Sequence, residues 1–528
     1  MNSRSVTVRL GVSLLSNGTR AALSFFAGLL LARALKPAAY GDMTFLLGSF
    51  VGMRTMLDMG ASNAFYTFIS GLKRSRKYFL VYLVWIALQF VGTSSAILFL
   101  MPDRMVGGVW LGHSRGIILL AFFAAFMQQQ VWLTIAQIGE SSRKTVRVQA
   151  MNLGIALVHL GLVLILMHIR VLSAPTVFVA MIAEYLVAIG CACVLLRSRQ
   201  TATIGEDPVE VTYVKIIGEF FVYCRPLVLL SIVGFAYDFA DRWMLQRFSG
   251  SAQQGLYQAA YQIAAISLLA ATSVMRVFWK EISEAHALGN LTRIAYLYQR
   301  VNRGLLMFAA IVSAFVIPWT REIIKILLGA NYLPGASVLI IMFLFPVHQT
   351  MGQVGGTMLL ASGNTRWYTT VSTLAMLLSL PVSYAVQAPR SAMVPGLGMG
   401  AIGLALKMVI IGVVSVNVQA FIIARIFTWK FDWFFQVVGI GSVIALSVVA
   451  KCVGSLFWHP VSTGIVATLT PIGISACIYS CLIATLLWFQ PWLVGMDRGE
   501  VGRISRHLLN TVAGRIDRES EPAVSRYQ

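Results

Sequence analysis

Long apolar stretches separated by short charged or turn-forming segments dominate this chain. A helix needs roughly 20 predominantly apolar residues to cross about 30 Å of hydrocarbon. Fourteen windows of about that length stand out: 10–32, 43–70, 78–101, 116–139, 148–169, 174–196, 217–240, 256–278, 304–328, 335–361, 367–387, 398–424, 433–456 and 464–489. The pattern therefore predicts an all-α, polytopic membrane protein with about 14 transmembrane helices.

The composition excludes several other classes of protein. Hydrophobic residues make up 58% of the chain and charged residues only 12%, with a mean hydropathy of +0.77. Soluble domains carry about twice that charged fraction, so a soluble enzyme, a secreted disulfide scaffold and a disordered tail are excluded. The sequence has no GxxxxGK[ST] phosphate loop and no histidine spacing typical of a metal site. We expect no enzymatic activity, no cofactor and no metal.

The net charge of +21 reflects membrane topology. If both termini are cytoplasmic, 26 of the 41 Lys and Arg residues lie on the cytoplasmic side and 10 on the opposite side. Cytoplasmic loops are enriched in Lys and Arg. The split predicts a multi-pass protein with both termini in the cytoplasm, and it removes the reason to expect nucleic acid as a partner.

A small set of charges falls inside the apolar windows. Arg20, Arg54, Glu184 and Lys407 lie near the middle of their windows, where a charged group costs at least ~2.5–3.5 kcal/mol to insert. Three of the four are cations, which suits an anionic ligand, and the planar fork of Arg suits phosphate in particular. We therefore predict Arg20, Lys407, Arg54 and Arg225 as substrate-binding residues.

Ordinary charge pairing remains an alternative for each of these residues. Arg54 and Asp58 are four residues apart on one helix and could neutralise each other, as could Asp238 and Arg242. Arg225 could extend to the cytoplasmic surface. Arg20 and Lys407 lack an acid one turn away, so they either contact the ligand or pair between helices with Glu184 or Asp58. We assign five residues to coupling or gating: Asp58, Glu184, Asp238, Asp241 and Arg242.

An internal repeat predicts the domain organisation. Leu31-x-Arg33 followed by Gly41 recurs 214 residues later as Leu245-x-Arg247 followed by Gly255, and transporters are often built from two similar halves. We expect two six-helix bundles and two extra helices. The predicted parts are an N-terminal lobe at 1–200, a C-terminal lobe at 201–430, spans 13 and 14 at 431–490, and a basic cytoplasmic tail with an amphipathic helix at 491–528.

Several short motifs resemble those of one transporter family. The segment 32–41 is similar to the pattern AR-x-LG-x-x-x-YG, and Leu57-Asp58-Met59-Gly60 is similar to L-D-x-G. Asp241-Arg242-Trp243-Met244-Leu245 and the segment 255–261 match DR-x-x-L…G-x-Y-x-x-A-Y, while Asn331-Tyr332 and 360–365 also fit. In this order, the motifs resemble the polysaccharide-biosynthesis flippases of the multidrug/oligosaccharidyl-lipid/polysaccharide exporter superfamily.

The resemblance implies a flippase of the bacterial inner membrane. It would move a polyprenyl-diphosphate-linked oligosaccharide to the outer leaflet by alternating access, for O-antigen or exopolysaccharide synthesis. The partners would be this substrate, membrane lipids, H⁺ or Na⁺ as a coupling ion, and polysaccharide-assembly proteins. Two alternatives stay open: a multidrug or lipid II exporter of the same superfamily, and a membrane glycan polymerase. A polymerase would need a sizeable outer loop bearing catalytic acids or arginines.

Overall fold

A computed structural model of the chain describes residues 3–71, 76–196, 212–456, 465–500 and 502–503. Every regular element of these residues is helical. The first elements are α1 (Ser3–Asp58), α2 (Ala61–Gly71), α3 (Arg76–Ser95), the π-helical turn η1 (Ala96–Leu100), α4 (Asp103–Val109), α5 (Arg115–Phe126), the π-helical turn η2 (Met127–Val131), α6 (Trp132–Ser141), α7 (Thr145–His168) and α8 (Ala174–Leu195). The next are α9 (Tyr213–Cys224), η3 (Arg225–Leu227), α10 (Val228–Ala264), η4 (Ala265–Ser267), α11 (Leu268–Ala287), α12 (Leu291–Val316), η5 (Ile317–Trp319) and α13 (Thr320–Leu327). The last are η6 (Ala330–Gly335), α14 (Ala336–Met342), α15 (Phe345–Ala361), α16 (Thr365–Gln387), α17 (Gly400–Ile426), α18 (Phe434–Leu456), α19 (Ile465–Phe489) and η7 (Pro491–Val494).

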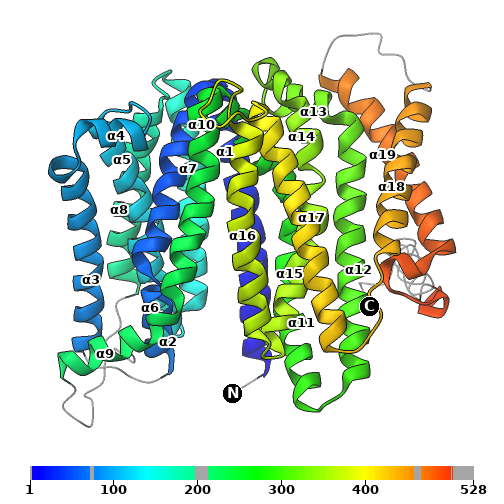
Figure 1. Ribbon diagram of the computed structural model, residues 1–528, viewed down its shortest axis with the longest axis horizontal. Coiled ribbons are helices and arrows are strands. Elements are labelled where there is room, and N and C mark those ends of the chain that lie inside the picture. The colour runs from blue at the N-terminus through cyan, green and yellow to red at the C-terminus, as the bar shows by residue number, and fades with distance from the viewer. Residues whose placement is uncertain (1–2, 72–75, 197–211, 457–464, 501, 504–528) are drawn as a thin grey trace, which may run out of the picture. The chain divides into compact units, whose positions relative to one another are not determined.

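The predicted all-α membrane fold is confirmed. Among the described residues, 12 helices are long and apolar enough to cross a membrane. Two of them, Ser16–Asp58 with 43 residues and Tyr213–Ser267 with 55, would extend roughly two and nearly three times the hydrocarbon thickness if straight. Each turns back instead, as α1 does in Figure 1, so the expected number of about fourteen crossings is approximate but consistent. Most of the predicted amphipathic tail helix lies outside the described residues.

The two turns are equivalent positions of the internal repeat. Lys36 has φ 64° and ψ 168°, and Gly250, 214 residues later, has φ 83° and ψ 169°. This positive-φ conformation favours glycine and costs other residues energy. The sequence repeat is therefore also a structural repeat, with the same backbone turn between its first two crossings.

Two glycines of the repeat pack against each other reciprocally. A Cβ atom at Gly41 would lie 2.8 Å from the carbonyl carbon of Ser251 and 2.9 Å from the amide nitrogen of Gly255. A Cβ atom at Gly255 would lie 2.8 Å from the carbonyl carbon of Pro37 and 3.1 Å from the amide nitrogen of Gly41. Only glycine permits such an approach of two backbones. This explains why Gly41 and Gly255 belong to the repeated motif.

A second equivalent pair of contacts lies further along the same helices. Arg242 donates a hydrogen bond from Nη1 to the carbonyl oxygen of Gly48 at 3.0 Å. Gln262 donates from Nε2 to the carbonyl oxygen of Phe25 at 3.1 Å, and its side chain covers Gly28. Because Gly28 and Arg242 are 214 residues apart, as are Gly48 and Gln262, the contacts again relate the two halves of the repeat.

The second predicted span is interrupted. We expected one span over 43–70, but α1 ends at Asp58, and Met59 and Gly60 have φ 48° and 88° before α2 begins. The Asp58 carboxylate accepts hydrogen bonds from the Ser62 amide at 3.2 Å and the Ser62 hydroxyl at 2.6 Å. Asp58 thus caps α2 as an N-cap residue does. The L-D-x-G motif is the sequence of a helix break.

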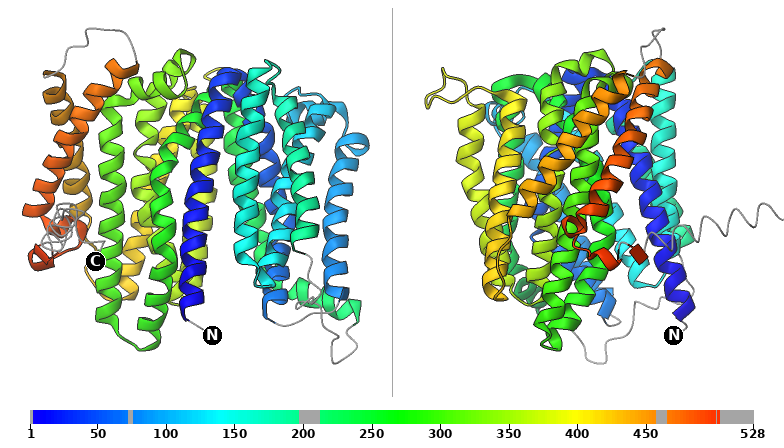
Figure 2. Two further views of the ribbon diagram at one scale, coloured as in Figure 1. Left: turned by 180° about the vertical axis from the view of Figure 1, so that it is seen from behind. Right: turned by 90° about the vertical axis from the view of Figure 1, so that its right-hand side faces the viewer.

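The chain divides into two compact units. The first contains Met1–Ile263, Ile323–Met342 and Thr370–Ile411, and the second contains Ala264–Glu322, Phe343–Thr369 and Gly412–Gln528. Apolar residues of α12, α15, α17, α18 and α19 form a core in the second unit, with α18 and α19 side by side in Figures 1 and 2. In the first unit, Trp132 and Tyr185 pack with Ala188 and Ala192. The expected division into lobes at 1–200 and 201–430 stays a prediction.

Candidate functional site

A polar cavity of about 730 Å³ lies in the first unit. Its walls come from α1, the π-helical turn η2, α6, α7 and α8. A cavity lined by so many polar groups within apolar helices is a candidate ligand site. The polar and charged residues that line it are Asn17, Arg20, Ser24, Gln128, Gln129, Gln137, Glu140, Gln149, Asn152, His159 and Glu184.

Arg20 and Glu184 both line this cavity, but they are not paired with each other. Glu184 is 5% exposed, and its Oε2 lies 2.9 Å from Nδ1 of His159. Among the ion pairs of the described residues, none involves Arg20, which is exposed to the cavity. Arg20 thus lines the cavity, and its binding of an anionic ligand stays a prediction.

A π-helical turn supplies the amide groups of one wall. The turn η2 has the sequence Met-Gln-Gln-Gln-Val, and such turns are frequent at functional sites. Gln128 donates to the hydroxyl oxygen of Tyr185 at 3.1 Å, and Gln129 donates to Gln128. Both line the cavity, whereas Gln130 takes part in a different cluster.

Aromatic and carboxamide groups complete the cavity. The rings of Trp132 and Tyr185 have centroids 6.3 Å apart, and Nε1 of Trp132 donates to Oδ1 of Asn152 at 2.8 Å. Gln137 and Gln149 are buried, at 9% and 8% exposed, and their side-chain oxygens have no hydrogen-bond partner in the described part of the chain. Buried polar atoms normally have a partner. In this conformation the protein itself encloses these two unsatisfied oxygens.

Arg54 and Asp58 belong to a second polar cluster at the break after α1. Arg54 donates from Nε to Oε1 of Gln130 at 2.8 Å and from Nη2 to the hydroxyl of Ser62 at 3.3 Å. Ser62 in turn donates to Asp58 and accepts from the hydroxyl of Tyr82 at 2.9 Å. Arg54 and Asp58 are thus linked through the neutral hydroxyl of Ser62. The sequence had suggested a direct pairing of the two charges along one helix.

Lys407 forms a buried ion pair in the first unit. Its Nζ lies 2.6 Å from Oδ2 of Asp241, with the lysine side chain fully buried, and 4.5 Å from the ring centroid of Tyr237. Ser383 donates to the other carboxylate oxygen. The partner differs from Glu184 and Asp58, the two acids considered from the sequence. Asp238 lies one turn before Arg242, whose guanidinium contacts Gly48.

Arg225 lies outside the polar cavity. It begins the 3₁₀ turn η3 next to Pro226, is exposed, and lines a separate apolar groove with α3 and α9. The structure thus assigns the four predicted cations to four different surroundings. Arg20 lines the polar cavity, Arg54 lies in the cluster at the helix break, Lys407 is in the buried ion pair and Arg225 is at the apolar groove.

His159 and the cavity glutamines were not predicted as site residues. His159 lies nine residues before the end of α7, and Glu184 lies ten residues after the start of α8. Similar distances from the connecting turn bring residues of antiparallel helices to a similar depth. That spacing could have identified the pair from sequence.

Together, the membrane-length helices and their internal repeat define a polytopic α-helical membrane protein with a polar intramembrane cavity. Residues 9–286 match the model of the polysaccharide biosynthesis protein family. This chain belongs to that family, which confirms the resemblance found in the motifs.

Solved structures share the fold at low sequence identity. The lipid II flippase MurJ, in an inward closed conformation, is 15% identical with a TM-score of 0.65, and the match covers 90% of this chain and 98% of that chain. A mutant of the Vibrio cholerae MATE transporter VcmN is 13% identical with a TM-score of 0.50, covering 80% and 97%. An inward-facing multidrug resistance MATE transporter of the MOP superfamily is also 13% identical with a TM-score of 0.50, covering 79% and 98%. A search of curated proteins finds no match.

Proposed function

We propose that this protein is a flippase for a polyprenyl-diphosphate-linked oligosaccharide. It moves the substrate from the cytoplasmic to the outer leaflet of a bacterial inner membrane, for cell-surface polysaccharide synthesis. Transport needs no covalent chemistry, because work comes from differential binding in two conformations. Membership of the polysaccharide biosynthesis family and the fold shared with a lipid II flippase support this proposal.

The proposal rests on the position of Arg20 in the wall of the polar cavity. Its guanidinium faces the cavity, and the nearby acid Glu184 is engaged by His159. A guanidinium binds two phosphate oxygens at once in a planar arrangement. The diphosphate would bind at Arg20, since a site built for a cationic drug would require an unpaired acid in its place.

The rest of the cavity suits a sugar. Carboxamides both donate and accept hydrogen bonds, as sugar hydroxyls do, and six of them line the cavity: Asn17, Gln128, Gln129, Gln137, Gln149 and Asn152. Trp132 and Tyr185 add apolar ring faces beside these groups.

The other predicted residues would serve the conformational change. The ion pair of Lys407 with Asp241, together with Asp238 and Arg242, joins α10 to α17 and to α1. A change in protonation or ion binding there would alter how these helices pack. We propose this cluster as the coupling site for H⁺ or Na⁺. We also propose that both chain termini lie in the cytoplasm.

Reversal of the charge at Arg20 tests the proposal. Arg20→Glu and the matched control Arg104→Glu, an exposed residue of α4, are reconstituted in vesicles with a fluorescent polyprenyl-diphosphate oligosaccharide. We expect Arg20→Glu to abolish its movement between leaflets, and Arg104→Glu to retain it. Normal transport by Arg20→Glu would refute the role of the cavity. Transport of cationic drugs without transport of the glycolipid would favour the multidrug exporter.

A further inference from the structure

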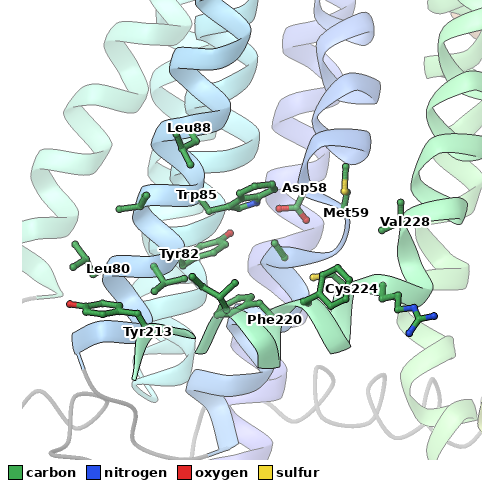
Figure 3. A pocket seen from close by; sticks show the side chains of 16 residues that line it. Asp58, Met59, Leu80, Tyr82, Trp85, Leu88, Tyr213, Phe220, Cys224 and Val228 are labelled. Atoms are coloured by element: carbon green, nitrogen blue, oxygen red, sulfur yellow. The ribbon is translucent and has the colours of Figure 1, made fainter. Parts of the chain in front are cut away.

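A second cavity, which is apolar, lies beside α3 and α9. It measures about 590 Å³, and Figure 3 shows Leu80, Trp85, Tyr213, Phe220 and Cys224 around it. It shares no lining residue with the polar cavity. The proposed transport site therefore leaves this apolar groove without a function.

Two helix breaks create the groove. Gly60, with φ 88°, ends the interruption after α1, and Pro226 in η3 lacks an amide hydrogen and interrupts the chain between α9 and α10. Leu227 packs directly against Gly60, where a Cβ atom would meet its Cδ1 at 2.5 Å. Because of these breaks, α9 runs across the ends of the neighbouring helices in Figure 1. The space between α9 and α3 is left open.

The groove is accessible from the surroundings of the protein. Leu88 on α3 and Phe221 on α9 both line it, yet they are 60% and 66% exposed. Around a membrane-spanning helix, exposed aliphatic and aromatic side chains contact lipid chains. An open apolar groove of this kind fits a hydrocarbon chain.

The rim of the groove carries an excess of basic residues. Arg225 lines the groove, and Nζ of Lys77 lies 5.6 Å from the ring centroid of Tyr213, another lining residue. Arg76 and Lys215 are exposed on the same two helices. The acids nearby are engaged: Asp58 by Ser62, and Glu219 by the hydroxyl of Tyr78. Basic pockets next to membrane helices bind anionic lipid headgroups.

We propose that this groove is a binding site for one anionic phospholipid. An acyl chain lies between α3 and α9, and Lys77 and Arg225, at the two ends of α9, attract the charge of the lipid phosphate. The bound lipid is a resident of the protein and not its cargo, so the proposal does not depend on the transport function. Since both helix breaks border the groove, the bound lipid would also stabilise the packing around them.

Native mass spectrometry of the full-length protein tests the proposal. The protein is purified from vesicles of equal phosphatidylglycerol and phosphatidylethanolamine, and retained lipid is counted. We expect phosphatidylglycerol to be retained preferentially. The double variant Lys77→Gln/Arg225→Gln should lose about thirty-fold in preference, from about fivefold per base. The control Arg170→Gln, an exposed residue outside the groove, should keep it. Equal retention of both lipids by the unmodified protein would overturn the proposal.

A variant that fills the groove tests the place of the acyl chain. Val84→Trp adds bulk at a lining residue that is 49% exposed, and Leu164→Trp on α7 is a matched control at 48%. A phosphatidylglycerol with a photoreactive acyl chain should label the peptides 80–88 and 217–228 in the unmodified protein and in Leu164→Trp, but not in Val84→Trp. Unchanged labelling in Val84→Trp would overturn the proposal. Displacement of the label by an equimolar polyprenyl diphosphate would also overturn it, in favour of the cargo's own chain.

Discussion

Alanine at Gly41 is expected to weaken the packing between the Lys36 and Gly250 turns. The added Cβ would lie 2.8 Å from the carbonyl carbon of Ser251 and 2.9 Å from the amide nitrogen of Gly255. Carbon atoms prefer about 3.5–4.0 Å, so the helices must separate by about 1 Å. Both opposing groups are backbone, and no side-chain rotation can relieve the overlap.

The expected magnitude follows from the cost of overpacking. Such insertions typically cost about 1–3 kcal/mol, which corresponds to roughly a 5- to 150-fold change in a conformational equilibrium. In the proposed alternating-access cycle, this shift favours any conformation in which the two turns are apart. The present conformation should therefore lose population in Gly41→Ala.

Distance measurements between spin labels can check this shift. Ala38 and Ala252 are exposed, equivalent positions of the repeat that flank the glycine contact. With the six native cysteines replaced by serine, labels at these positions should show fewer short distances in Gly41→Ala. Gly234→Ala is the control, because nothing lies within 4 Å of its added Cβ. Identical distance distributions for all three proteins would refute the argument from backbone overlap.

Three further predictions concern individual polar contacts. Lys407→Gln should reduce the free energy of unfolding by about 3–5 kcal/mol, because it leaves Asp241 buried without its partner. Adding Asp241→Asn to this variant should restore part of the lost free energy. Strictly additive losses of the two substitutions in thermal unfolding would contradict the buried ion pair. Asp58→Ala should cost about 0.5–2 kcal/mol by removing the cap of α2, with faster hydrogen exchange in 61–71, and unchanged exchange there would argue against capping. A hydrogen bond from Arg300 lowers the pKa of Glu500, so this contact persists above the ordinary Glu pKa and is lost as pH falls through the lowered value. After correction for the intrinsic slowing of amide exchange in acid, the protection of 491–500 should then fall at acidic pH, and Arg300→Gln should remove that pH dependence.

Much of the fold could be predicted from the sequence, because a membrane imposes simple rules on helix length and loop charge. The repeat at Gly41 and Gly255 was also visible, since both glycines are required by one kind of backbone contact. The break at Asp58 and Gly60 was missed. Apolar residues continue on both sides of it, and hydropathy alone does not register a change in φ.

The candidate site was only partly predictable. Depth within an apolar window identified Arg20 and Glu184, both of which line the polar cavity. Depth could not reveal which groups face each other, because facing depends on helix rotation and packing. Lys407 thus met Asp241 instead of the acids we considered, and His159 was overlooked as the partner of Glu184.

The π-helical turn η2 adds one residue to this membrane crossing. Its one extra residue per turn lets Gln128 and Gln129 face the polar cavity while Gln130 joins Arg54 and Tyr82. Five residues of a π turn cover about the same rotation as four residues of an α-helix. Deleting any one of these glutamines would therefore restore an ordinary α-helix without turning its flanks, and Trp132 and Gln137 would stay in the cavity wall. The π turn thus gives this crossing one more carboxamide than a regular helix could hold, and a single-residue gap would remove that group while leaving the rest of the wall in place.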